Sequence, residues 1–206
     1  MENIKKEARK LLDAREAIKK RIRVLNYVDN EMIAKIHLIS SEIVECIKNG
    51  NKVLTCGNGG SAANAQHITG DIVGRFKRER RGFAGVALTV DTSTLTAIGN
   101  DYDYSVVFER QLEGIGKRGD ILIALSSSGN SLNVIKAVEK AKRMDIKTIG
   151  FLGNNGGKLG ELVDISITIP DKESDLCEEF AMALSHIILE EAEAKLCELI
   201  DKGVMV

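Results

Sequence analysis

The stretch "CGNGGSAANAQH", residues 56–67, decides the fold and holds the first candidate site. The apolar run "KVLT" precedes it, and three glycines, Gly57, Gly59 and Gly60, separate that run from a helix-like segment. A glycine-rich loop that leads from a strand into a helix presents backbone N–H groups to an anion. The sequence therefore predicts a strand, an anion-binding loop and a helix that carries His67.

Short apolar runs alternate with helix-like segments in the rest of the chain. The runs are "KVLTCG", "GVALTV", "DILIALS", "KTIGFLG" and "DISITIP". Strands that are apolar at consecutive positions are typical of a parallel sheet covered on both faces. Their alternation with helices predicts an α/β fold, an open doubly wound sheet of these five strands. In such sheets ligands bind at the loops that leave the carboxyl ends of the strands.

Helices are predicted at both ends of the chain. Residues 2–49 are expected to form two helices, with Asn30 as the N-cap of the second and Gly50 as its C-terminal stop. His37 lies in the second helix, and we interpret it as an ordinary residue of a helix face. This N-terminal pair is expected to pack on the domain or on a neighbouring subunit.

A last long helix is predicted from about Asp175 to Lys202, and no repeat or low-complexity segment interrupts the chain. Residues 1–206 are therefore interpreted as a single domain, a length that suffices for one hydrophobic core.

Composition excludes several classes of protein. The formal net charge is -1, which argues against a general nucleic-acid binder. No apolar run is long enough to span a bilayer, and the charged start "MENIKKEARK" lacks the core of a signal peptide. We therefore expect a cytoplasmic protein with no membrane partner. The four cysteines form no CxxC pair and are expected to be free thiols, at least partly buried, in a reducing compartment.

The first loop can be compared with two known nucleotide-binding patterns, of which one stays open and one is excluded. Gly57, Gly59 and Ala62 satisfy a dinucleotide fingerprint with alanine in its third place, although the chain leaves little room for a separate substrate domain. A P-loop is excluded, because no Lys-Ser or Lys-Thr pair follows the glycines.

A second polar loop, "LSSSGNSLN" (residues 125–133), ends the third apolar run. Hydroxyls and backbone N–H groups at the start of a helix form a phosphate site, because the helix dipole and the unpaired donors face the anion. No lysine or arginine lies close by in sequence, which suits a sugar phosphate monoester better than a triphosphate. Asn100 and Asp101, between the two loops, are either a structural turn pair or a part of the same crevice.

In this order the residues resemble the sugar isomerase (SIS) fold and, more closely, the phosphoheptose isomerase family. The resemblance covers about residues 50–200 and implies an SIS-type doubly wound five-stranded parallel sheet flanked by helices. The stretches that carry it are "CGNGGSAANAQHITGDIVGRF", "ALTVDTSTLTAIGNDYDY", "GDILIALSSSGNSLNVIKAVEKAK" and "GGKLGELVDISITIP".

The resemblance implies a sugar-phosphate site built from the first loop, the Asn-Asp pair and the serine loop. The substrate-binding residues it indicates are Asn58, Gly59, Gly60, Ser61, Asp71, Asn100, Asp101, Ser126, Ser127, Ser128, Ser131 and Glu178. The family usually has threonine at position 127, and serine keeps the hydroxyl there.

The resemblance also implies one zinc ion per subunit, held by His67, Asp71, Glu178 and His186. Asp71 stands where the family has glutamate, and Glu178 stands where it has glutamine; the family's neighbouring arginine is absent from "LCEE". His67 and Asp71 are four residues apart, so they share a helix face and form a sensible ligand pair. Two imidazoles and two carboxylates also suit Fe²⁺ or Mn²⁺.

Glu178 and His186 are eight residues apart, which on one straight helix is about 12 Å of rise. They cannot comfortably reach one metal ion from a continuous helix. Either the helix begins after Glu178, or the two residues come from different subunits. We favour the second arrangement, in a homo-oligomer with sites at its interfaces, and the resemblance implies a tetramer.

The resemblance implies a metal-dependent aldose–ketose isomerase, and we expect it to act on sedoheptulose 7-phosphate through an enediol. Asp71 and His186 are the predicted proton-transfer residues, and Glu178 is the substitute if Asp71 cannot reach. The alternatives are a non-enzymatic tetramer of the same fold that binds the replication initiator protein, and an isomerase or sensor for another sugar phosphate. A dehydrogenase is the remaining possibility.

Overall fold

A computed structural model describes residues 14–205. The five predicted strands are all present: β1 (Val53–Cys56), β2 (Gly85–Ala87), β3 (Ile121–Ser126), β4 (Lys147–Leu152) and β5 (Ile165–Thr168). The helices are α1 (Ala14–Leu25), α2 (Asn30–Lys48), α3 (Gly60–Val73), α4 (Thr92–Asp101), α5 (Val107–Ile115), α6 (Leu132–Arg143), α7 (Gly157–Leu162) and α8 (Ser174–Asp201), with a 3₁₀ turn, η1 (Tyr104–Val106).

The strands form one parallel sheet in the order β2-β1-β3-β4-β5. The chain reverses direction across the sheet between β1 and β3, and in doubly wound folds this is where ligands bind. The two loops singled out from the sequence leave these two strands. The topology therefore brings the glycine loop and the serine loop side by side at one edge of the sheet.

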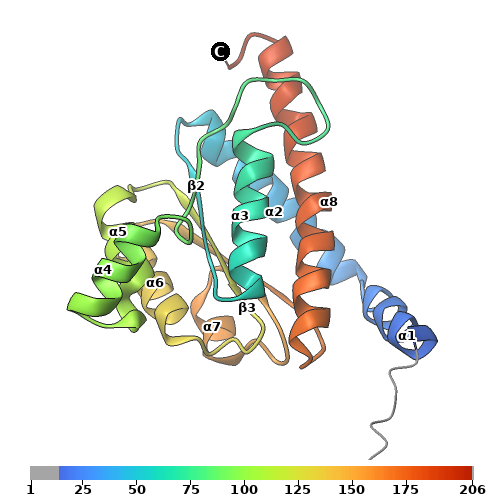
Figure 1. Ribbon diagram of the computed structural model, residues 1–206. Helices are drawn as coiled ribbons and strands as arrows, with labels where there is room; N and C mark the ends of the chain where they lie inside the picture. Colours follow the sequence, from blue (N-terminus) through green and yellow to red (C-terminus); the bar gives the residue numbers. More distant parts are fainter. Residues whose placement is uncertain (1–13, 206) are drawn as a thin grey trace, which may run out of the picture.

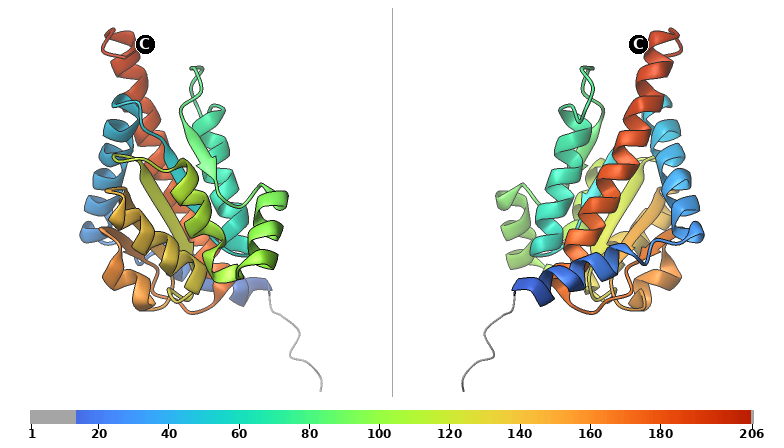
Figure 2. Two further views of the ribbon diagram at one scale, coloured as in Figure 1. Left: turned by 90° about the vertical axis from the view of Figure 1, so that its left-hand side faces the viewer. Right: turned by 90° about the vertical axis from the view of Figure 1, so that its right-hand side faces the viewer.

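Helices cover both faces of the sheet (Figures 1 and 2). Successive strand residues point to opposite faces, so Ile121 and Ile123 of β3 pack with α2, α3 and α8, while Leu122 and Ala124 pack with α5 and α6. Every residue of β3 is buried. This is why the strand sequences are continuously apolar, and it confirms the predicted α/β class.

The N-terminal helices differ from the prediction in one detail. The N-cap of α2 is Asp29, whose side chain accepts a hydrogen bond from the Met32 N–H, so the assignment to Asn30 is wrong by one residue. Gly50 follows the helix with φ of +72°, the left-handed conformation expected of a stop. The part of the first predicted helix before Ala14 lies outside the described residues.

Helix α1 crosses the first half of α8 (Figure 2). Its Val24 is 2% exposed, and Arg21 forms ion pairs with Asp175 and Glu179 of α8. The predicted last helix runs from Ser174 to Asp201, within one residue of its expected bounds. None of the helices in the described part of the chain has the length and apolarity that a membrane span requires.

Candidate active site

The glycine loop turns tightly between β1 and α3. Gly59 has φ of +56°, which L side chains rarely adopt, and it is the N-cap of α3. A Cβ on Gly57 would lie 2.8 Å from the Ser61 carbonyl oxygen, so only glycine allows this close approach. The backbone N–H groups of α3 therefore open toward the carboxyl end of the sheet.

Glu178 of α8 lies against this helix start. Its carboxylate packs on Gly60 so closely that any Cβ there would collide with it, and the Ser61 N–H lies close enough to affect its pKa. Burial raises the pKa of the Glu178 carboxyl, and the Ser61 N–H partly offsets this. Asn64 donates to the Glu178 backbone carbonyl at 2.8 Å, which fixes α3 to α8. Glu178 thus acts as a cap for α3 from another part of the chain.

The serine loop forms the neighbouring wall. Ser126 Oγ lies 3.2 Å from Ser131 Oγ and 3.5 Å from Ser128 Oγ, and the Asn130 N–H donates to Ser128 Oγ. Ser131 is the N-cap of α6, yet its side chain makes no capping bond. Its hydroxyl faces Ser126 of the same loop instead, and binding of a phosphate by this loop stays a prediction. The Ser127 hydroxyl donates to Ser174 Oγ at the start of α8, at 3.4 Å.

Asn58 connects the two loops. Its amide exchanges two hydrogen bonds with the amide of Asn133 in the first turn of α6, both at 2.9 Å. The Tyr104 hydroxyl donates to Asn58 Oδ1 at 3.1 Å. Sequence reasoning missed Asn133 and Tyr104; the available signal for Asn133 was a buried polar position in an otherwise apolar helix face.

Asn100 and Asp101 end helix α4 and are not a turn pair. Both are exposed, and Asn100 Nδ2 donates to Asp101 Oδ1 at 2.9 Å. Their predicted contact with substrate stays a prediction.

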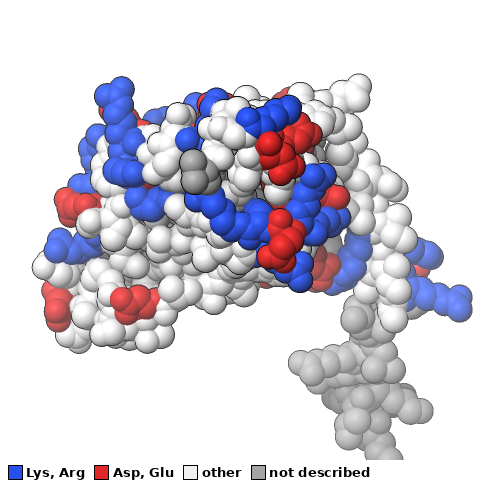
Figure 3. All heavy atoms as spheres, turned by 90° about the horizontal axis from the view of Figure 1, so that it is seen from above, with Lys and Arg blue, Asp and Glu red and all other residues white. Residues whose placement is uncertain are grey.

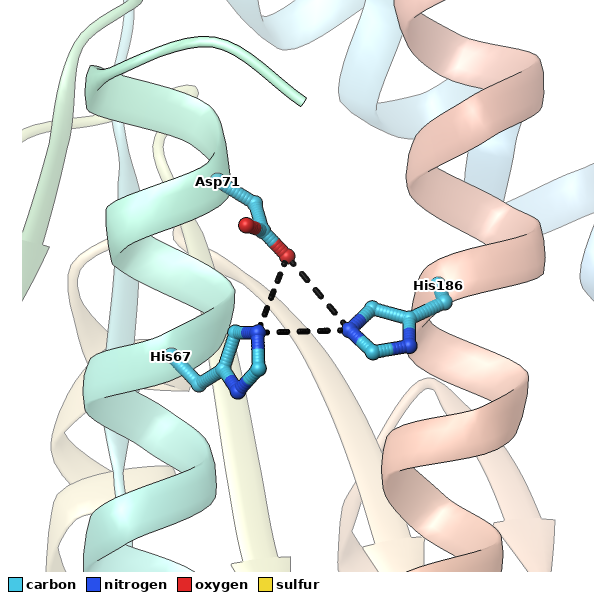
Figure 4. A group of neighbouring side chains, drawn as sticks. All are labelled: His67, Asp71 and His186. Atoms are coloured by element: carbon cyan, nitrogen blue, oxygen red, sulfur yellow. Dashed lines mark hydrogen bonds and ion pairs between the residues drawn. The ribbon is translucent and has the colours of Figure 1, made fainter. Parts of the chain in front are cut away.

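A second cluster lies farther along α3. His67 and Asp71, on one face of α3 as predicted, meet His186 from the middle of α8 (Figure 4). The Nε2 atoms of the two histidines are 3.3 Å apart, and Asp71 Oδ2 lies 3.6 Å from each. Residues separated by 119 positions in sequence thus present three ligand atoms to one point.

The spacing of these three atoms fits a tetrahedral cation. Ligands at about 2.0–2.1 Å from a tetrahedral metal are separated by about 3.3 Å, close to the observed spacings. Asp71 Oδ2 is buried and has no hydrogen-bond partner among the described residues. Burial raises the pKa of the Asp71 carboxyl, against the opposing charges of His67 and His186. A cation here would satisfy an atom that otherwise bears an uncompensated desolvation cost.

Glu178 is not part of this cluster. Helix α8 is continuous from Ser174, so the alternative in which the helix begins after Glu178 is wrong. About 12 Å of helix rise separates Glu178 from His186, and its carboxylate faces the start of α3 instead. Within one chain the structure brings together three of the four predicted ligands.

The segment that follows α3 packs against His186 of the cluster and is held by α8. Phe76 stacks on the His186 ring, with centroids 5.3 Å apart and planes 20° from parallel. Glu193 of α8 accepts hydrogen bonds from the N–H groups of Phe76, Lys77 and Arg78 and pairs with Arg80 at 2.9 Å. This clamp holds Phe76 in place over His186.

Arg80 also completes the end of α3. Its guanidinium donates to the carbonyls of Asp71, Ile72 and Gly74, where the helix dipole favours a cation. No sequence pattern distinguishes this buried arginine from its exposed neighbours. Figure 3 shows the outer surface of this end of the molecule, where Lys and Arg side chains alternate with Asp and Glu.

Comparison with known proteins agrees with the fold. The SIS domain family matches residues 16–153. The phosphoheptose isomerase of Nitratiruptor sp. is 47% identical over 171 residues, which is 82% of this chain and 87% of that protein. That of Aliarcobacter butzleri is 51% identical over 158 residues, or 77% and 79% of the two chains.

Solved structures give the same result. The phosphoheptose isomerase of Neisseria gonorrhoeae superimposes with a TM-score of 0.82 at 35% identity, covering 87% of this chain and 96% of that one. That of Francisella tularensis gives 0.79 at 32% identity, covering 86% and 93%.

The fold and the matched domain define an SIS-domain protein. Within that class the chain belongs to the phosphoheptose isomerase family, and it is accordingly a sugar-phosphate isomerase. The non-enzymatic and dehydrogenase alternatives are therefore set aside.

Proposed function

We propose that the protein converts sedoheptulose 7-phosphate to D-glycero-D-manno-heptose 7-phosphate. The observation that carries the proposal is the convergence of His67, Asp71 and His186 between α8 and α3, the helix that leaves the glycine loop, in a chain similar to phosphoheptose isomerases. The serine loop and the start of α6 would bind the phosphate, because clustered hydroxyls and the N–H groups of a helix start suit an anion. The glycine loop would bind the sugar.

His67, Asp71 and His186 would hold one divalent cation. Two imidazoles and a carboxylate leave a position open, as in catalytic zinc sites, so Zn²⁺ is our first choice and Fe²⁺ or Mn²⁺ the alternatives. Such an ion would polarise the substrate carbonyl and stabilise developing negative charge on its oxygen.

Asp71 and His186 are the proposed proton-transfer groups. The reaction breaks the C1–H bond of the ketose and forms a C2–H bond, through an enediol in which the intervening proton shift occurs between O1 and O2. Asp71 suits the base because burial raises its pKa and so increases its affinity for a proton. Glu178 is the alternative proton-transfer group if Asp71 cannot reach the substrate. Its negative charge near the glycine loop would also influence which sugar the site accepts.

We further propose a homo-oligomer, a tetramer with sites at its interfaces, in the cytoplasm. The support is a set of large apolar side chains on α1, α2 and α8 that one chain leaves exposed. Its residues are Ile18, Ile22, Leu25, Ile33 and Ile187. Light scattering coupled to size-exclusion chromatography tests the assembly: a monomer at micromolar concentration contradicts it.

The test of the reaction is turnover of sedoheptulose 7-phosphate with Zn²⁺, after chelation, and in two histidine variants. We expect chelation and His186→Asn each to reduce kcat at least 100-fold. His37→Asn is the matched control, because His37 is a half-exposed histidine of α2 paired with Glu191. Turnover that survives chelation and His186→Asn contradicts the metal role. Absence of turnover by a metal-loaded protein contradicts the proposed substrate.

A further inference from the structure

Asn133 sets the orientation of an amide network between the two loops. It is 3% exposed, and its Oδ1 accepts a hydrogen bond from the Val134 N–H at 3.0 Å. The Val134 N–H also donates to the Ser131 carbonyl at 3.1 Å. Because a main-chain N–H can only donate, an amide nitrogen of Asn133 at this position would face it with a second donor, so the side-chain atom next to Val134 is the oxygen. The Nδ2 of Asn133 must therefore donate to its partner, Asn58.

The orientation of Asn58 follows from that of Asn133. Asn58 Oδ1 accepts from Asn133 Nδ2 and from the Tyr104 hydroxyl, which uses both of its lone pairs. Asn58 Nδ2 donates one of its two protons to Asn133 Oδ1. A single N–H therefore remains for a ligand, and Asn58 can only donate to it.

The Tyr104 hydroxyl is left with the complementary hydrogen-bonding capacity, that of an acceptor. Its hydroxyl proton is engaged by Asn58 Oδ1 at 3.1 Å, so its oxygen can only accept from a ligand. The residue is 58% exposed although it is joined to the loop at this point. Beside it, Ser105 accepts a hydrogen bond from Lys136 Nζ at 2.6 Å, which fastens η1 to α6. Tyr104 thus reaches the loops from a fixed support.

Asn58 and Tyr104 together offer one donor next to one acceptor. A sugar hydroxyl accepts one hydrogen bond and donates another, so it satisfies both groups. A phosphate oxygen only accepts, so it would leave the tyrosine oxygen unmatched. We propose that Tyr104 is a substrate-contacting residue that, with Asn58, binds a hydroxyl of the sugar, and that Asn133 is the positioning residue for this pair.

This inference rests on the proposed function, and it is tested with Tyr104→Phe, which removes only the hydroxyl. We expect KM for sedoheptulose 7-phosphate to rise about three- to tenfold, the value of one hydrogen bond to a neutral group. The affinity for inorganic phosphate, measured by calorimetry, should not change. Tyr102→Phe is the matched control, because Tyr102 is equally exposed (61%) and lies two residues away; it should change neither value.

The outcomes separate this proposal from the proposed reaction. An unchanged KM in Tyr104→Phe overturns the contact while leaving the reaction intact. Equal weakening of sugar phosphate and inorganic phosphate also overturns it, because the hydroxyl would then only support the loop. If wild-type protein binds sedoheptulose 7-phosphate without turnover, the reaction fails and calorimetry of Tyr104→Phe decides the contact. If it does not bind this sugar, both proposals fail.

Discussion

Replacement of Glu193 by glutamine is expected to destabilise the protein strongly. Glu193 and Arg80 are 4% and 3% exposed in their side chains. The carboxylate accepts from three successive backbone N–H groups as well as from the guanidinium. Glutamine keeps one oxygen and replaces the other with a donor, so at least one partly buried N–H group loses its acceptor and the Arg80 charge loses its counterion.

The size of the effect follows from these losses. Removal of one partner of a buried ion pair costs about 3–5 kcal/mol, because the remaining charge stays buried without compensation. An unsatisfied N–H costs about 1–3 kcal/mol when it is fully buried, but these groups are only partly buried and water can replace the lost acceptor, so we add nothing for it. We therefore expect Glu193→Gln to lower the free energy of unfolding by about 3–5 kcal/mol, a large share of the total for a typical domain.

The assay is urea unfolding at one fixed protein concentration, so that assembly contributes equally to each variant. Glu198→Gln is the matched control from the same helix: its pair with Lys202 is 64% and 67% exposed and should contribute less than about 1 kcal/mol. A loss below about 1 kcal/mol in Glu193→Gln would refute the clamp as a source of stability.

Three further predictions concern pH, the glycine loop and the thiols. Burial opposes ionisation of the Glu193 carboxyl, but the hydrogen bonds from its backbone donors and the charge of Arg80 have the larger effect and lower its pKa below 4.5. The free energy of unfolding should therefore be higher at neutral pH and decline as the pH falls below about 4.5. In Glu193→Gln this decline should be less steep. Gly60→Ala should displace the Glu178 carboxylate and lower thermal stability and substrate affinity, whereas Gly70→Ala, with no neighbour within 4 Å of its Cβ, should be neutral or stabilising. All four cysteines are buried, and burial raises the pKa of Cys56 to about 12. Dithionitrobenzoate should therefore react with all four thiols only after the protein is unfolded. Rapid reaction of the native protein would contradict this.

The sequence alone determined the parts of the fold that depend on local patterns. Continuous apolar runs identified all five strands, because a parallel strand is buried on both faces. The glycine and serine loops were recognisable because special backbone geometry and helix starts require particular residue types. His67 and Asp71 could be paired from their spacing, because a helix places residues four apart on one face.

Only the tertiary structure decided which distant residues complete the site. His186 meets Asp71 because α8 packs beside α3, and the same packing directs Glu178 to the start of α3 rather than to the histidines. The contact that Asn133 makes in the site also comes from a residue distant in sequence, because its amide bonds to Asn58. Local sequence patterns indicate which residues are neighbours along one strand or helix. Contacts between distant residues depend on how the helices pack on the sheet, and the spacing of residues in the chain does not predict them.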